Sequence, residues 1–163
     1  MKVLLIIPAY KGEEILLIIK EKDKESRIKC FEKDKISTLY EKYNAKGIFT
    51  YNFKILDDDS TFRESRVNNF SIIDVINPND GMNVIFKTTS GIMKIIALSI
   101  DCPVGLAIIY FLIEYNPFYL FSFIKNKKCV RFSFNIGRLL FIQDETTIAN
   151  FFKIRDPKVI VSF

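Results

Sequence analysis

The chain has 163 residues, of which 49% are hydrophobic and 26% are charged, and its formal net charge is +5. This length suits one ordinary domain or two small ones. The composition excludes a disordered chain, because 16 Phe and many Ile side chains supply enough apolar surface for a core. The sequence contains no histidine, which excludes Ser-His and Cys-His nucleophiles and His-based zinc sites in this chain.

The first third of the chain is predicted to be rich in strands. Apolar runs over residues 2–10 and 13–22 are separated by Lys11-Gly12, so we expect a hairpin there rather than a secretory signal. The alternating SRIKCFEKD predicts a third strand. Asp34 precedes KISTLYEKYNAKG, whose apolar residues recur at helical spacing. We therefore expect a helix that Asp34 caps and Gly47 ends.

Four more strands are expected before the next helix. They are IFTYNFKIL, SIIDVI, NVIFKTT and MKIIALSI, and the acidic DDDSTFRES and the turn-rich NPNDG separate the first three. These segments make the first hundred residues a predominantly antiparallel region with a single helix.

An apolar helix is predicted after Cys102-Pro103, over VGLAIIYFLIEYN, and Asn116-Pro117 ends it. The longest uncharged stretch there, CPVGLAIIYFLI, has 12 residues, fewer than the ~20 needed to cross a bilayer, so no membrane span is expected. The strands FYLFSFI, CVRFSF and RLLFIQ, the helix TTIANFFKI and the strand KVIVSF are predicted to follow.

The sequence thus predicts an α+β fold with two domains. A strand-rich N-terminal domain with one helix is expected over residues 1–101. A C-terminal domain of helix, three strands, helix and strand is expected over residues 102–163. Cys30, Cys102 and Cys129 are odd in number and lack paired spacing. We expect them to be reduced, which favours a cytoplasmic location.

Basic residues concentrate near the C-terminus. Residues 123–163 hold eight Lys/Arg and three Asp/Glu, which equals the whole net charge of +5. Such a surface is expected either to contact RNA phosphates or to keep the protein soluble as a solvated basic face. The candidate RNA-binding residues, on two basic hairpins and at the junction before the last strand, are Lys125, Lys127, Lys128, Arg131, Arg138, Lys153, Arg155 and Lys158.

An acidic run, Asp57-Asp58-Asp59, precedes Ser60-Thr61. Adjacent carboxylates can hold a divalent cation, but the same run is typical of an acidic surface loop after a strand. We expect the loop, and the sequence therefore assigns no metal site, no cofactor and no catalytic residue.

The order of predicted elements from Val104 onward resembles the C-terminal domain of archaeal tRNA-splicing endonucleases. VGLAIIYFLIEYNPFYLFSFI resembles that family's helix running into its first strand, and RLLFIQDETTIANFFKIRDPKVIVSF resembles its strand, acidic turn, helix and final apolar strand. RIKCFEKDKISTLYEKYNAKGIF is similar to the family's N-terminal strand and helix. The resemblance covers about half of the chain and implies a nuclease-like sheet.

The catalytic residues of that family are a Tyr, a His and a Lys. The segment that matches the histidine region has Asn135, Gly137 and Arg138, and the lysine region reads Arg155-Asp156-Pro157-Lys158. The resemblance therefore implies a non-catalytic structural subunit in a hetero-oligomer, with a catalytic endonuclease subunit and precursor tRNA as its partners.

Two other functions remain open from the sequence. VLLIIPAYKGEE and FKILDDDSTF are similar to the first strand and the second Asp motif of family 2 glycosyltransferases, which implies a nucleotide-sugar-binding protein with Asp57 or Asp58 on the uridine. Alternatively, the chain is a protein-protein assembly module in which KVIVSF adds to a partner's sheet edge.

Overall fold

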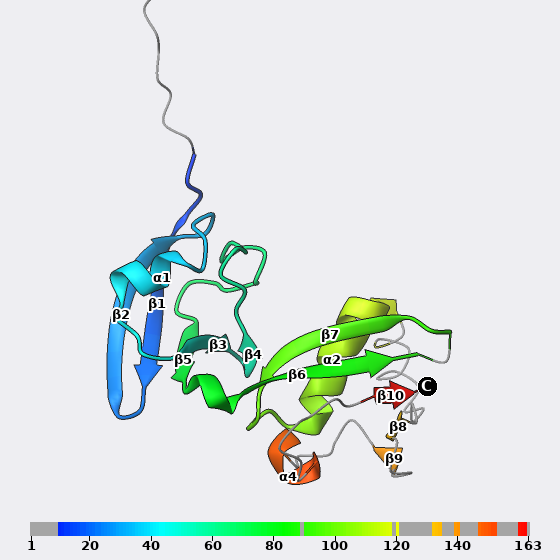
Figure 1. Ribbon diagram of the computed structural model, residues 1–163. Coiled ribbons are helices and arrows are strands. Elements are labelled where there is room, and N and C mark those ends of the chain that lie inside the picture. Colours follow the sequence, from blue (N-terminus) through cyan, green and yellow to red (C-terminus); the bar gives the residue numbers. More distant parts are fainter. Residues whose placement is uncertain are drawn as a thin grey trace, which may run out of the picture. The chain divides into compact units, whose positions relative to one another are not determined.

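The computed structural model describes residues 10–88, 90–118, 120, 132–134, 139–140, 147–152 and 160–162 (Figure 1). The chain forms two compact units with an α+β fold. Unit 1 runs to Tyr51 and resumes over Leu56–Val75, whereas unit 2 consists of Asn52–Ile55 and the residues from Ile76 onward. This division differs from the expected boundary between residues 101 and 102, because three strands before that point belong to the second unit.

Unit 1 contains a mixed sheet and one short helix. Its strands, in the order β2-β1-β5-β3, are β1 (Glu14–Glu21), β2 (Lys24–Phe31), β3 (Ile48–Tyr51) and β5 (Ile72–Ile76), and its helix is α1 (Thr38–Lys42). β1 is antiparallel to β2 and parallel to β5.

The hairpin of unit 1 is formed by β1 and β2, so the expected hairpin between residues 2–10 and 13–22 is wrong. β1 pairs with β2 from Glu14 to Glu21, and its other edge pairs with β5. Alternation explains the strand: Ile15, Leu17 and Ile19 are buried while the residues between them are partly exposed.

Helix α1 is shorter than the sequence suggested. It has five residues and ends at Lys42 rather than at Gly47. Asp34 does not cap it, because the Asp34 carboxylate accepts a hydrogen bond from the Phe31 backbone N–H. The core of unit 1 is therefore closed largely by loop residues. Its buried members are Ile15, Leu17, Ile19, Cys30, Ile36, Leu39, Phe49, Leu56, Phe62, Val67 and Ile73.

The strands of unit 2 follow one another in the order β4-β7-β6-β10-β8-β9. Its elements are β4 (Lys54–Ile55), the 3-10 helix η1 (Pro78–Asp80), β6 (Gly81–Lys87), β7 (Met93–Ser99), α2 (Val104–Tyr115), β8 (Phe132–Phe134), β9 (Leu139–Leu140), α4 (Ile148–Phe152) and β10 (Ile160–Ser162). The expected single strand IFTYNFKIL is divided into β3 and β4 by a turn at Asn52 and Phe53, which both have positive φ.

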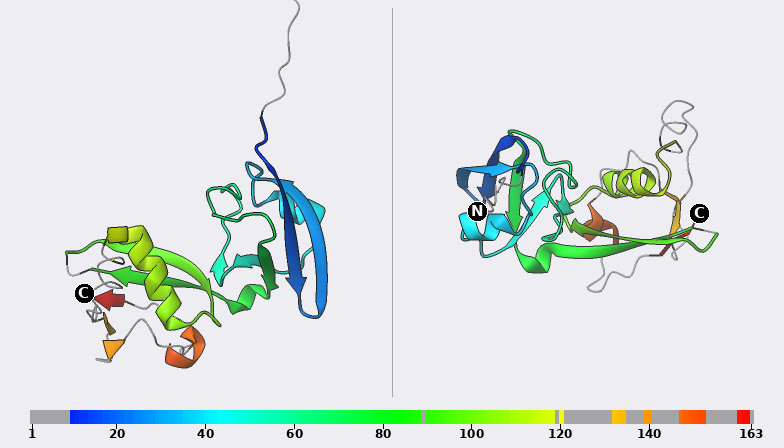
Figure 2. Two further views of the ribbon diagram at one scale, coloured as in Figure 1. Left: turned by 180° about the vertical axis from the view of Figure 1, so that it is seen from behind. Right: turned by 90° about the horizontal axis from the view of Figure 1, so that it is seen from above.

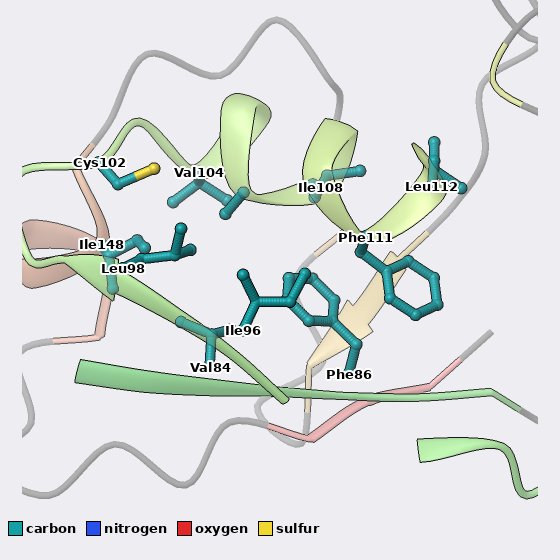
Figure 3. Packing of buried hydrophobic residues seen from close by; sticks show 11 residues of the cluster. Val84, Phe86, Ile96, Leu98, Cys102, Val104, Ile108, Phe111, Leu112 and Ile148 are labelled. Atoms are coloured by element: carbon teal, nitrogen blue, oxygen red, sulfur yellow. The ribbon is translucent and has the colours of Figure 1, made fainter. Parts of the chain in front are cut away.

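Helix α2 lies across one face of β6 and β7 (Figure 2). Its buried residues face Val84, Phe86, Ile96 and Leu98 of the hairpin (Figure 3). The Phe111 ring stacks on Phe86 with a centroid distance of 4.8 Å. The expected buried helix is confirmed, and it is held against the sheet by apolar packing along its length.

Most of the expected elements of the C-terminal region are present where the structure describes them. β8, β9, α4 and β10 each fall inside a segment predicted to have that structure. The start of the expected strand FYLFSFI is instead helical at Phe118 and Leu120. The rest of that segment lies outside the described residues.

Candidate functional site

The candidate RNA-binding residues are located here by the described elements next to them in sequence. All eight lie outside the described residues. Arg131 immediately precedes β8, Arg138 immediately precedes β9, and Lys153 immediately follows α4. The basic excess therefore belongs to the segments that connect the last described elements of unit 2.

The C-terminal strand is an interior strand of unit 2. β10 pairs in parallel with β6, where Ile160 lies opposite Ile85, and antiparallel with β8, where Val161 lies opposite Phe134. Both of its edges are occupied, so the expectation that KVIVSF adds to a partner's sheet is wrong.

The acidic loop satisfies its own polar groups. The Asp57 carboxylate accepts hydrogen bonds from the Asp59 N–H and from the Ser60 hydroxyl, both at 3.1 Å. Asp59 forms an exposed ion pair with Lys35 at 3.4 Å. Across the described ranges, no group of three or more His, Cys, Asp or Glu residues is arranged to hold a metal ion. The arrangement is that of an ordered surface turn.

The surroundings of Asp58 shift the pKa of its carboxyl upward. Desolvation raises the pKa of Asp58, the negative charges of Asp57 and Asp59 raise it further, and the nearby Tyr40 hydroxyl opposes the shift. The pKa of Tyr40 is also raised, first by desolvation and then by the Asp58 charge. Its ring packs edge-on against Phe49 at 4.7 Å. The pair joins the acidic loop to α1, which carries Tyr40.

Cys30 and Cys102 are buried and free. Burial raises the pKa of Cys102 to about 12. Burial also raises the pKa of Cys30, although the Lys42 ammonium partly opposes that shift. Both thiols are therefore poor nucleophiles, because the thiolate is the reactive form. Cys129 lies outside the described residues.

Unit 2 contains a polar cluster that the sequence did not predict. The Lys54 ammonium pairs with the Glu114 carboxylate at 2.7 Å and lies 5.9 Å from the centre of the Tyr110 ring. The Tyr110 hydroxyl donates to the Asn52 carbonyl at 2.7 Å. These contacts join β4 to α2 over about sixty residues of chain. No local pattern could have revealed them, because their members are far apart in sequence.

Exposed apolar side chains gather at one end of the β6–β7 hairpin. Ile92, Met93 and Ile95 are 45%, 59% and 57% exposed. The exposed residues Lys87 and Lys94 lie beside them on the same two strands. Apolar groups in such positions are typical of surfaces that bind another protein.

The structure offers little for the glycosyltransferase resemblance. In that resemblance the first strand corresponds to VLLIIPAYKGEE, of which residues 3–9 lie outside the described residues. Its acidic motif corresponds here to the self-bonded turn at Asp57.

None of the helices that the structure describes is long and apolar enough to cross a membrane.

Comparison with known proteins gives no family assignment. No protein-family model matches the chain, and no curated protein is significantly similar to it in sequence.

Proposed function

We propose that this chain is a non-catalytic structural subunit of a tRNA-splicing endonuclease. It supports a separate catalytic subunit and contacts precursor tRNA. The observation that carries the proposal is the succession of α2, β8, β9, α4 and β10 within unit 2. In the archaeal family that the sequence resembles, the order is helix, three strands, helix and strand, and the described succession contains both helices, two of the three strands and the last strand.

The absence of catalysis in this chain follows from its composition. RNA cleavage of this kind uses a general base and a general acid near neutral pH, and the family uses a histidine for that purpose. The chain contains no histidine. Asn135 and Gly137 occupy the segment that resembles the histidine region. The catalytic residues therefore come from the partner subunit.

RNA contact is assigned to the basic residues of the last quarter of the chain. Lys and Arg side chains bind phosphates and release condensed counterions, so the affinity falls with rising salt. Lys127, Lys128, Arg131 and Arg138 lie within twelve residues of one another, in the segments that flank β8 and β9.

The partner subunit cannot bind by adding a strand to β10, since β6 and β8 already flank that strand. The exposed Ile92, Met93 and Ile95 side chains provide an apolar surface for it instead. An apolar surface flanked by lysines suits an obligate partner, because the charges keep the free subunit soluble until it assembles.

The RNA contact is tested by neutralising Lys127, Lys128, Arg131 and Arg138 together as Gln. We expect weaker binding to precursor tRNA and a smaller slope of log affinity against log salt, by up to about three, since each phosphate contact contributes about 0.7 to 0.9. Circular dichroism checks that the fold is retained. The matched control neutralises four exposed basic residues elsewhere, namely Lys22, Lys24, Lys46 and Arg66. An unchanged affinity or salt slope in the first variant, or an equal loss in the control, would rule out this surface.

A further inference from the structure

β2 is the edge strand of the unit 1 sheet, with β1 as its only sheet neighbour among the described strands (Figure 1). Glu21 and Lys24 close the hairpin around a two-residue turn. In such a ladder, hydrogen-bonded pairs alternate with pairs whose backbone groups point away from each other. The residues of β2 that point their N–H and C=O outward are therefore Glu25, Arg27, Lys29 and Phe31.

Half of this edge is already occupied. The Lys29 carbonyl accepts a hydrogen bond from the Lys42 ammonium at 2.7 Å. The Phe31 N–H donates to the Asp34 carboxylate, and the Phe31 carbonyl accepts from the Asp34 N–H, both at 2.9 Å. Among the described residues, the outward backbone groups of Glu25 and Arg27 have no partner. The open edge is thus the segment from Glu25 to Arg27.

We propose that this open edge pairs with the same edge of a second copy of the chain. The two β2 strands run antiparallel about a two-fold axis at Ser26. Glu25 then lies opposite Arg27 of the second copy, and Arg27 lies opposite Glu25 of the second copy. Each of these two pairs exchanges two N–H···O=C hydrogen bonds, and the sheets of the two copies become continuous.

Charge selects the second copy as the occupant, because the edge is complementary to itself in this register. Both side chains lie on the same face of the sheet, so each Glu25 meets an Arg27 across the new ladder. Lys29 of one copy also lies opposite Asp23 of the other, which is again an attraction.

The neighbouring registers are less favourable. Moving the axis to Arg27 places the two Arg27 side chains opposite each other and requires the Lys29 carbonyl, which Lys42 already occupies. Moving it the other way, to Glu25, places the two Glu25 side chains opposite each other. Like charges in directly opposed positions destabilise strand pairing.

The opposite charges of Glu25 and Arg27 distinguish this edge from one that is only protected by charge. Lysines on edge strands usually prevent pairing with other chains. Here the open segment carries one charge of each sign, so a uniform repulsion is absent for a second copy. The contact is small and leaves the core untouched, so the dimer is weak and forms at high protein concentration.

A charge swap tests the proposal. The full chain and the variants Glu25→Arg, Arg27→Glu and Glu25→Arg/Arg27→Glu are compared by sedimentation equilibrium, with concentrations that reach the millimolar range. Each single reversal converts two attractions into two repulsions and should weaken the dimer by about tenfold or more. The double variant restores both attractions and should recover the dimer. Glu41→Arg, an exposed reversal on α1, is the control and should change nothing.

The swap also separates the contact between copies from effects within one copy. Glu25 lies opposite Lys20 in the β1–β2 ladder, and both Glu25→Arg and the double variant lose that pairing. Recovery in the double variant therefore reports only the contact between copies. In the dimer, the amides of Glu25 and Arg27 should exchange hydrogen more slowly as the protein concentration rises. A monomer at every concentration, a dimer insensitive to the single reversals, or a failure of the double variant to recover would overturn the proposal.

Discussion

Unit 1 and unit 2 both bury an apolar core, but different kinds of structure close it. In unit 2, the 12-residue helix α2 supplies Val104, Ile108 and Phe111 from one face. In unit 1, loop residues such as Ile36, Phe62 and Val67 supply buried side chains to the core instead. Backbone hydrogen bonds such as Phe62 N–H to the Asp34 carbonyl hold those loops. A helix pairs its backbone groups within itself, whereas a core that loops close depends on the hydrogen bonds of many separate turns.

The largest expected effect comes from truncating a buried side chain in one of the two cores. Phe111 is fully buried and stacks on Phe86 and Tyr115. Phe111→Ala should lower the free energy of unfolding of unit 2 by about 3 to 5 kcal/mol. Hydrogen exchange should speed up in β6, β7 and α2, while the amides of β1 and β2 stay protected, because the two cores share no buried residue. Phe118→Ala, at a position that is 85% exposed, is the control. Equal loss of protection in both units would contradict separate cores.

The turns of unit 1 provide a second test. Lys22 lies between β1 and β2 with φ +54, a left-handed conformation that costs a non-glycine residue about 1 to 2 kcal/mol. Lys22→Gly removes this strain and loses part of the gain through the entropy of the unfolded chain, so stability should rise by about 0.5 to 1 kcal/mol. Lys24→Gly, inside β2, should lower stability by a similar amount. Urea denaturation measures both, and a loss of stability at Lys22 would refute the strain argument.

The smallest expected effect concerns the acidic loop. The pKa of Asp58 is raised in the folded state, chiefly by desolvation and then by Asp57 and Asp59. Its contribution to stability is therefore present below the unfolded pKa and is lost as pH rises through the folded pKa. Asp58→Asn should be slightly more stable than the parent at pH 7, by less than about 0.5 kcal/mol because the site is exposed.

Thermal denaturation across pH 3 to 7 measures this difference. The advantage of Asp58→Asn should shrink as pH falls, since Asp58 itself becomes protonated and neutral. Asn44→Gln, at an exposed position outside the loop, changes no titratable group and should show no such trend. An advantage that grows towards acid pH would have the wrong sign.

The sequence predicted those elements whose pattern is strong and local. Helix α2 follows from an apolar run between Pro103 and Pro117, and β6 and β7 follow from apolar segments on either side of Ser90-Gly91. Helix α1 was overestimated because its apolar spacing continued past Lys42, whereas Tyr43 is extended and bonds Glu21 through its hydroxyl. Tertiary contacts had overridden local propensity there.

Pairing between distant segments could not be predicted. The choice of β2 rather than residues 2–10 as the partner of β1 depends on which strand fills each edge. The interior position of β10 depends likewise on β6, some seventy residues earlier. The opposite charges of Glu25 and Arg27 are visible in the sequence. Their role in pairing with a second copy can be inferred only once β2 is known to be an edge strand.

The central claim, a structural subunit of an RNA endonuclease, is tested most directly by purifying the chain from its native cell. The material that accompanies it is identified by mass spectrometry and assayed for cleavage of precursor tRNA. We expect a second, catalytic subunit in stoichiometric amount and cleavage by the recovered complex but not by this chain alone. Recovery of this chain without a nuclease subunit, as monomer or as homodimer, and without cleavage would contradict it.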